Sequence, residues 1–377
     1  MNKKLLLFSI YFFLFTLTGC WDFNEIQNNY LVPGIGIDED GENLLVSVRI
    51  PRPSISLESG VTSTREARII SRSAKTILDA IQTMNKETRN PIFLGHLEVV
   101  IINEEVAKKN LNLVLDTLLR NPQIQRQVYL LVTPQKAKDV LASVNPLDVS
   151  PMEDLNTKLE LGKSVFAIPM TLDQFAINLY CKRSCGILPI ITTSNNILSV
   201  SETAVFHNHE LVGTLDENDT RVLTFFLNPR LASPYYIVES SMPQSDKKQV
   251  VSIRTKRSSS KIKVLLKDGK VHAKLQLELT GRISEYAAQS SVKSDQEEYV
   301  LAAKQLEKLL SKQLETMVKK TQELNADILA IGKYVNAKYP AFYEDVNWEE
   351  GYKQVKFDVE VKVTIASASA TKINPNQ

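Results

Sequence analysis

The first twenty residues decide which part of this chain folds and on which side of a membrane it does so. Lys3 and Lys4 form a short positive segment, and residues 5–17 are apolar except for Ser9 and Thr16. A helix over residues 5–17 would span about 20 Å, less than the roughly 30 Å hydrocarbon layer of a bilayer. A positive segment followed by a short apolar one is typical of a secretory signal peptide. We therefore expect residues 1–19 to be removed and the remaining chain to fold outside the cytoplasm.

The apolar segment ends in Leu17-Thr18-Gly19-Cys20, which resembles the bacterial lipobox. The resemblance implies cleavage between Gly19 and Cys20. It also implies a diacylglycerol lipid, with acyl chains such as palmitate, joined to the Cys20 sulfur by a thioether. The alternative is an ordinary cleaved signal peptide with a cysteine present by chance. Because no later stretch reaches the roughly 18 apolar residues of a membrane span, Cys20 is the membrane attachment that we expect.

Composition excludes several classes of protein. The chain has 377 residues, of which 43% are hydrophobic and 23% charged, as in ordinary folded domains. Its length predicts two or three domains. Lys and Arg number 45 against 43 Asp and Glu, a formal net charge of +2. Proteins that bind phosphate backbones need a larger basic surplus, so no nucleic-acid partner is expected.

Alternating strand and helix patterns predict an α/β layer in the first 150 residues. Asp40-Gly41 marks a hairpin turn between two strand patterns, and residues 51–63 are expected to form a loop. The two strands of this hairpin are predicted at residues 31–37 and 44–50. Three more strands are predicted at residues 65–71, 97–102 and 128–132. Helices, ended by Asn-Pro pairs, are predicted at residues 73–86, 104–120 and 136–144.

The second half reads as helical first and then rich in strands. Residues 151–192 are mostly helical in pattern, including Leu172–Tyr180, and this pattern ends at Pro189. Residues 216–227 predict another helix. The long helix expected at residues 296–325 carries an apolar seam that includes Ala303, Leu310 and Met317. Strands are expected at residues 201–205, 210–214, 235–240, 250–255, 261–266, 271–280 and 355–365.

These patterns predict an α+β protein with separate sheets flanked by helices. The expected divisions are a signal peptide at 1–19, a connector at 20–30, an N-terminal α/β domain at 31–150, a middle domain at 151–232 and a C-terminal domain at 233–372. The charged face of the long helix is expected to be solvated while its seam packs on a sheet. The alternative is a helix that docks a partner.

The glycine pair Gly34 and Gly36 does not complete a dinucleotide fingerprint. That motif needs a third glycine at position 39 and a following helix, but Glu39 stands there and a hairpin follows. We expect a backbone kink leading into a strand. Sequence motifs for a phosphate-binding loop, a zinc protease or a serine hydrolase do not occur, so no enzyme activity and no cofactor is expected.

The histidines and late aromatic residues have more ordinary explanations than catalysis. His207 and His209 flank Asn208 in an expected turn, so metal binding there is disfavoured, and no metal site is expected in this chain. His96 has no acid at motif spacing and is expected to be a hydrogen-bonded structural residue. Packing rather than a ligand site is expected of the late aromatic residues Tyr334, Tyr339, Phe342, Tyr343, Trp348 and Tyr352.

Cys181 and Cys185 stand four residues apart and lie on one helix face if residues 172–185 stay helical. Free thiols and a disulfide both remain open, because an oxidising compartment permits a bridge whereas a bridge within one helix is strained. A metal site is the third alternative, although two thiolates are only half of a tetrahedral zinc site.

The order of several short motifs resembles the Ger(x)C family, the lipoprotein C subunits of nutrient germinant receptors in endospore-forming bacteria. The resemblance starts at the lipobox with Trp21-Asp22, continues through Gly34-Ile35-Gly36-Ile37-Asp38, and includes the residues Gly95-His96-Leu97-Glu98 with the apolar run that follows. The later matching residues are Glu202-Thr203-Ala204-Val205-Phe206, Leu211-Val212-Gly213-Thr214-Leu215, Ala326-Asp327-Ile328, Gly332, Tyr339-Pro340 and Trp348.

The resemblance implies a three-domain mixed α/β protein on the outer face of the spore's inner membrane. It implies a membrane A subunit and a transporter-like B subunit as partners, which together trigger germination in response to nutrients. No catalytic residues belong to the family pattern, so only Cys20 is assigned a role, as the lipid attachment site. The resemblance leaves open whether this subunit binds a nutrient.

Two other functions remain as alternatives. A lipid-anchored extracytoplasmic solute-binding protein of a transporter would show two similar α/β lobes around a hinge. A cell-envelope hydrolase would need a constellation of His, Asp, Glu and Ser that the sequence does not display. The expected function is therefore a non-enzymatic receptor subunit.

Overall fold

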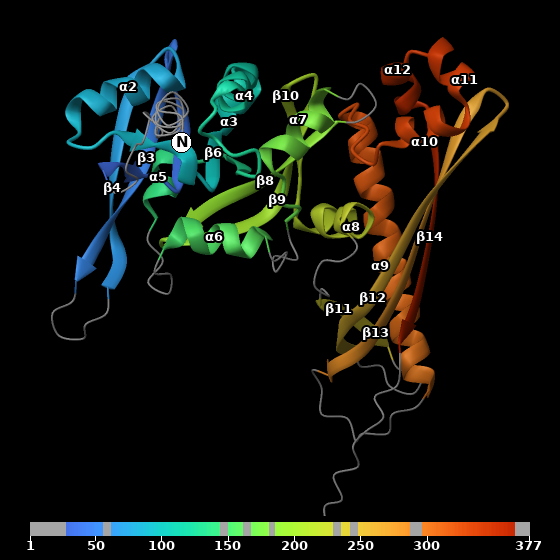
Figure 1. Ribbon diagram of the computed structural model, residues 1–377. Helices are drawn as coiled ribbons and strands as arrows, with labels where there is room; N and C mark the ends of the chain where they lie inside the picture. Colours follow the sequence, from blue (N-terminus) through green and yellow to red (C-terminus); the bar gives the residue numbers. More distant parts are fainter. Residues whose placement is uncertain are drawn as a thin grey trace, which may run out of the picture.

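The computed structural model describes residues 28–55, 62–143, 150–160, 167–180, 185–228, 235–241, 248–286 and 296–365. A large sheet with helices on both faces is followed by a four-stranded sheet that carries one long helix (Figure 1). This confirms the predicted α+β class with separate sheets flanked by helices. The signal peptide, the Gly19–Cys20 cleavage site, the Cys20 lipid site and Cys181 lie outside the described residues.

The large sheet has eight strands in the order β10-β9-β8-β7-β6-β2-β3-β4. Its centre is parallel, from β2 through β6 and β7 to β8, and antiparallel hairpins complete both edges. The strands are β2 Gly34–Asp40, β3 Asn43–Ile55, β4 Thr62–Ala74, β6 Val99–Asn103, β7 Tyr129–Thr133, β8 Gly186–Ser194, β9 Ile197–His207 and β10 Glu210–Leu215. Two short strands, β1 Tyr30–Leu31 and β5 Ile92–Phe93, pair separately.

Alternation along the central strand β6 explains the three-layer arrangement. Successive side chains of a strand point to opposite faces, and all four apolar residues of β6 are buried. Val100 and Ile102 belong to the core with helices α2 Ile77–Glu87, α3 Glu104–Lys109 and α4 Leu111–Arg120. Val99 and Ile101 pack in a second cluster with α5 Ala137–Ala142 and α6 Pro151–Glu160. The two groups of helices lie on opposite sides of the strands in Figure 1.

The glycine pair lies inside β2, so the predicted kink before the strand was wrong. Gly36 pairs with Ser47 of β3 on one side and Ile101 of β6 on the other. A Cβ atom on Gly36 would lie 3.0 Å from both the carbonyl carbon and oxygen of Ala137. Asp38 on the same strand accepts hydrogen bonds from the backbone N–H groups of Ala137 (2.6 Å) and Lys138 (2.9 Å). The close approach of α5, rather than a backbone kink, therefore explains why position 36 is a glycine.

The structure confirms the helix predicted at Leu172–Tyr180 but corrects the helical pattern predicted for residues 186–192. Two separate helices, α6 and α7 Leu172–Tyr180, are followed by strand β8, which contains Pro189. Isoleucine and threonine are frequent in this strand, as strand propensity favours. Pro189 pairs with Thr203 of β9, whereas the ladder to β7 consists of the single pair Val132 and Ile190. Pro189 lacks a backbone N–H, and it is tolerated here because the hydrogen-bond ladder between β8 and β7 is so short.

Three smaller boundaries also differ from the prediction. The helix expected at residues 104–120 is divided at Asn110, which ends α3 and starts α4. The expected loop at residues 51–63 is shorter, because β3 continues to Ile55 and β4 begins at Thr62. The strands expected at 250–255 and 261–266 are one strand, since the residues between them also pair with the neighbouring strand.

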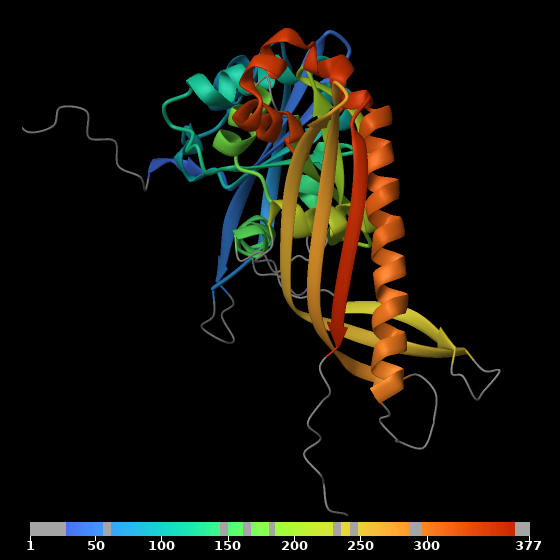
Figure 2. The ribbon, with the colours of Figure 1, turned by 90° about the vertical axis from the view of Figure 1, so that its right-hand side faces the viewer.

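The C-terminal sheet has the order β11-β12-β13-β14, with β13 and β14 parallel. Its strands are β11 Tyr235–Ser241, β12 Lys248–Lys267, β13 Lys270–Tyr286 and β14 Lys356–Ile365. Helix α9 Gln296–Glu323 runs along this sheet (Figure 2), and its seam residues Leu306, Leu310 and Met317 are buried. The prediction that the seam packs on a sheet is confirmed.

Shorter helices complete the molecule. Helix α8 Glu217–Leu227 packs between the two sheets and contacts α9, β9 and β12. Helices α10 Ile331–Lys338, α11 Pro340–Asp345 and α12 Trp348–Lys353 cluster near one end of α9 (Figure 2). Strands from both the 31–150 and the 151–232 segments belong to the large sheet, and the second sheet begins at Tyr235. Within the described part of the chain, every helix is too short or too polar to cross a membrane.

Candidate functional site

A pocket of about 610 Å³ lies where the edge of the large sheet meets the C-terminal helices. The turn between β9 and β10 forms one wall, and the segments around α9, α11 and α12 form the other. The aromatic side chains that line it are Tyr180, Phe206, Tyr343, Trp348 and Tyr352. Apolar walls with a few converging polar groups are typical of ligand and partner sites. The late aromatic residues Trp348 and Tyr352 are buried, as predicted for packing, and also line this pocket.

Asp327 organises the C-terminal wall of the pocket. Its carboxylate accepts hydrogen bonds from the backbone N–H groups of Ile331 and Gly332, both at 2.7 Å, and from the Trp348 indole N–H at 3.0 Å. Ala330, the residue before α10, has a left-handed backbone and no side chain able to cap the helix. Asp327 therefore satisfies the first N–H groups of α10 from a position four residues before the helix begins. The sequence analysis assigned Asp327 no such role.

Burial raises the pKa of the Asp327 carboxyl to about 6, although three hydrogen bonds favour its anion. We expect this group to make stability fall between about pH 4 and pH 6. The unfolded carboxyl releases its proton near 3.8. The folded state therefore binds more protons in this interval, and the free energy of unfolding decreases as pH rises. In urea titrations, the advantage of wild type over Asp327→Asn should be about 2 kcal/mol smaller at pH 7 than at pH 4.5. An equal difference at both pH values would contradict the raised pKa.

The Cys185 thiol and the His207 imidazole meet on the opposite wall. Cys185 Sγ lies 3.4 Å from His207 Nδ1, and His207 Nε2 lies 3.6 Å from Glu349 Oε1 across the pocket. Burial raises the pKa of the Cys185 thiol to about 12, so a neutral thiol is favoured over the reactive thiolate. Helix α7 ends at Tyr180, before both cysteines. The alternatives for the Cys181–Cys185 pair stay open, since Cys181 lies outside the described residues.

His207, Asn208 and His209 occupy a hairpin turn, as predicted. Asn208 and His209 have φ angles of 48° and 67°, the left-handed conformation that a tight hairpin requires. The His209 ring packs against Tyr180, with ring centroids 5.3 Å apart. The turn thus presents one imidazole to Cys185 and Glu349 and the other to an aromatic ring.

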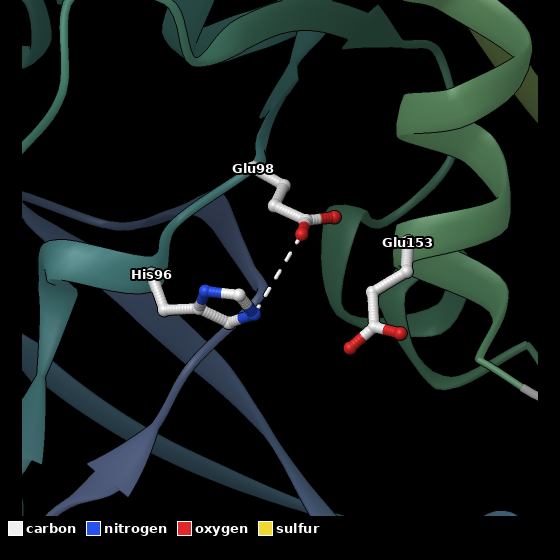
Figure 3. A group of neighbouring side chains, drawn as sticks. All are labelled: His96, Glu98 and Glu153. Carbon is white, nitrogen blue, oxygen red and sulfur yellow. Dashed lines mark ion pairs between the residues drawn. The ribbon is translucent and has the colours of Figure 1, made fainter. Parts of the chain in front are cut away.

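A second groove, of about 700 Å³, lies beside the N-terminal end of β6. It contains His96, at the end of the short helix η2 Leu94–His96, and Glu98 (Figure 3). His96 Nε2 lies 3.6 Å from Glu98 Oε1, an acidic neighbour that no sequence motif indicated. Burial raises the pKa of the Glu98 carboxyl, whose Oε2 is buried without a hydrogen-bond partner. The spacing of His96 and Glu98 was the signal that the sequence analysis missed.

Comparisons with known proteins identify the family. A model of the spore germination protein N-terminal domain matches residues 22–193, and a model of the spore germination B3/GerAC-like C-terminal domain matches residues 201–368. The chain belongs to the Ger(x)C family. Spore germination protein B3 of Bacillus subtilis (strain 168) is 24% identical over 94% of this chain and 96% of that protein. Spore germination protein GerQC of Bacillus cereus is 24% identical over 81% of this chain and 84% of that protein.

A solved structure shares the fold. The crystal structure of the GerBC protein has a TM-score of 0.59 to this chain at 18% identity, and the alignment covers 89% of this chain and 97% of that one. In this Ger(x)C protein, the motif residues 34–38 fall in the centre of the large sheet, and Asp327, Gly332 and Trp348 form the hydrogen-bonded wall of the pocket. These family motifs therefore lie at buried positions of the large sheet and of the pocket wall.

Proposed function

We propose that this chain is a lipid-anchored, non-enzymatic subunit of a nutrient germinant receptor, which acts with membrane A and B subunits to trigger spore germination. Family membership carries the proposal: the two spore-germination models match residues 22–193 and 201–368 in succession. Relatives named as spore germination proteins B3 and KC align over more than nine-tenths of this chain. The lipobox at residues 17–20 supports placement on the outer face of the spore's inner membrane.

The polar groups of the pocket support a binding role rather than catalysis. Both oxygens of Asp327 already accept hydrogen bonds that hold α10 and Trp348. The Cys185 thiol is held neutral by burial. Groups that are occupied in this way position the wall of the pocket and do not act as a free base or nucleophile. The cavity is thus suited to a side chain of a partner or to a small molecule.

A lipid on Cys20 would make modest protein interfaces sufficient for assembly. Two acyl chains, at about 0.8 kcal/mol per buried CH₂, hold a protein at a bilayer essentially permanently. Confinement to one membrane raises the effective concentration of the chain near membrane partners. We therefore assign Cys20 the role of keeping the folded domains beside the A and B subunits.

Cys20→Ala tests this proposal in spores that contain the variant as their sole copy. Mass spectrometry of the wild-type chain should find an acylated Cys20 and no residues 1–19, whereas the variant should carry no acyl mass. Nutrient-triggered germination should slow at least about tenfold, because tethering is lost or misplaced. Glu42→Ala, an exposed residue of the turn between β2 and β3 that leaves the lipobox intact, is the control and should germinate normally. Unchanged germination by a chain without lipid would refute the role of the anchor.

The unlike architecture of the two units disfavours a solute-binding protein. One unit is an eight-stranded mixed sheet, and the other is a four-stranded sheet with one long helix. Two similar lobes around a hinge are therefore not what this chain forms. Calorimetry with amino acids, sugars and nucleosides tests the alternative, since micromolar binding by the isolated mature chain would favour a solute carrier and would count against the receptor subunit.

A further inference from the structure

Three potential metal ligands converge beside β6, and two of them, His96 and Glu98, line the groove. His96 ends helix η2, Glu98 directly precedes β6, and Glu153 lies in the first turn of α6. Figure 3 shows the three side chains directed toward a common space between these elements. One ligand atom from each lies within 4.8 Å of the other two. Among the residues that the structure describes, this is the group of three that could hold a metal ion.

The distances are close to those of a coordinated ion. Zinc–ligand bonds of about 2.0–2.2 Å in a tetrahedron place ligand atoms about 3.3 Å apart. His96 Nε2 and Glu98 Oε1 are already 3.6 Å apart, and the dashed line in Figure 3 marks this pair. Glu153 is exposed, and its long side chain has rotatable bonds enough to close the remaining distance. The backbone can therefore stay in place when an ion binds.

The electrostatics of the groove favour a cation. Glu98 Oε2 is buried and has no hydrogen-bond partner, which is costly for a carboxylate unless a cation compensates it. Glu160 and Asp173 also line the groove, against one arginine, Arg126, among its described lining residues. The structure thus concentrates negative charge around an imidazole, whose neutral form is a metal ligand.

We propose that His96, Glu98 and Glu153 bind a divalent transition-metal ion of the zinc class. One imidazole with two carboxylates suits Zn²⁺, whereas Ca²⁺ and Mg²⁺ take oxygen ligands and gain nothing from His96. Three protein ligands leave a coordination position open to the groove, where water or a side chain of a partner can bind. The ion would join the segment before β6 to α6, two parts of the chain that the sequence separates by more than 50 residues.

Zinc binding by the purified mature chain in detergent tests the proposal. After treatment with a chelator, titration against a chromophoric zinc indicator should give one site per chain, and zinc should raise the melting temperature. His96→Ala, Glu98→Gln and Glu153→Gln should each weaken zinc binding at least roughly tenfold. Glu160→Gln removes the same charge from the same groove without removing a ligand, and it should bind zinc like the wild type. Circular dichroism verifies that each variant is folded.

Other outcomes would overturn the site. No zinc uptake by the wild type would mean that His96 and Glu98 form an ion pair only. Equal weakening by Glu160→Gln and Glu98→Gln would indicate a general charge effect instead of coordination. Zinc binding that His96→Ala leaves unchanged would exclude the imidazole as a ligand. Zinc binding that is lost in His207→Gln and kept in His96→Ala would place the ion in the other pocket. None of these results depends on the lipid anchor or on germination.

Discussion

Asp327→Ala should lower the free energy of unfolding by about 4 kcal/mol. The variant leaves the N–H groups of Ile331, Gly332 and Trp348 without the carboxylate that accepts their hydrogen bonds. Asp327 is 4% exposed, so water cannot readily replace the lost acceptor. Unfolding in urea can be followed by tryptophan fluorescence, because Trp348 is one of only two tryptophans in the chain and contacts Asp327 directly.

Two further variants separate the hydrogen bonds from a general effect of substitution. Asp327→Asn keeps one acceptor oxygen but presents an NH₂ group to the other donors, so it should cost roughly half as much as alanine. Asp345→Ala changes an exposed aspartate of the neighbouring α11 and should stay within about 0.5 kcal/mol of the wild type. If Asp327→Ala proves as mild as Asp345→Ala, the carboxylate does not hold the pocket wall.

Gly36→Val should destabilise the large sheet by at least about 3 kcal/mol. A Cβ atom at this position meets the backbone carbonyl of Ala137 at 3.0 Å, and the two methyl groups of valine add to the crowding. Backbone cannot rotate aside as a side chain does, so α5 must move away from β2. That movement also weakens the hydrogen bonds from Ala137 and Lys138 to Asp38. Thermal unfolding monitored by circular dichroism measures the loss.

A graded series tests the cause. Gly36→Ala should cost less than valine, about 1–2 kcal/mol, because it adds one methyl group. Adding Ala137→Gly to Gly36→Ala should not restore stability, since the close atoms belong to the Ala137 backbone. Full rescue by that second change would show that the Ala137 side chain, and not the path of α5, requires a glycine in β2.

Local patterns predicted most elements correctly. The apolar runs of β6 and β7, the amphipathic helix α2 and the seam of α9 each lie within a few residues of their predicted positions. Strand β8 was missed because a short apolar run containing a proline has no clear period. The break at Asn110 was also missed, since both halves continue the apolar spacing of one helix.

The side chains that build the two cavities could be identified only in part. His96 and Glu98 are neighbours in sequence, but Glu153 joins them only because α6 packs on the sheet face formed by Val99 and Ile101. Asp327 and Trp348 are likewise brought together only because α12 contacts α10. These long-range contacts depend on strand order and on how helices pack, and the local periodicity of the sequence does not reveal either.

The amino-acid sequence by itself determined the expected export signal, the lipid-attachment motif, the class of fold and the family, since each depends on residue types at short spacing. Tertiary structure alone decided that strands from both halves of the first 215 residues share one sheet, and that α5 lies close enough to β2 to require Gly36. It also decided which acids surround His96 and what Asp327 holds. The physical reason is that backbone geometry imposes periods of two or 3.6 residues, whereas long-range contacts follow from burying both faces of a sheet at once.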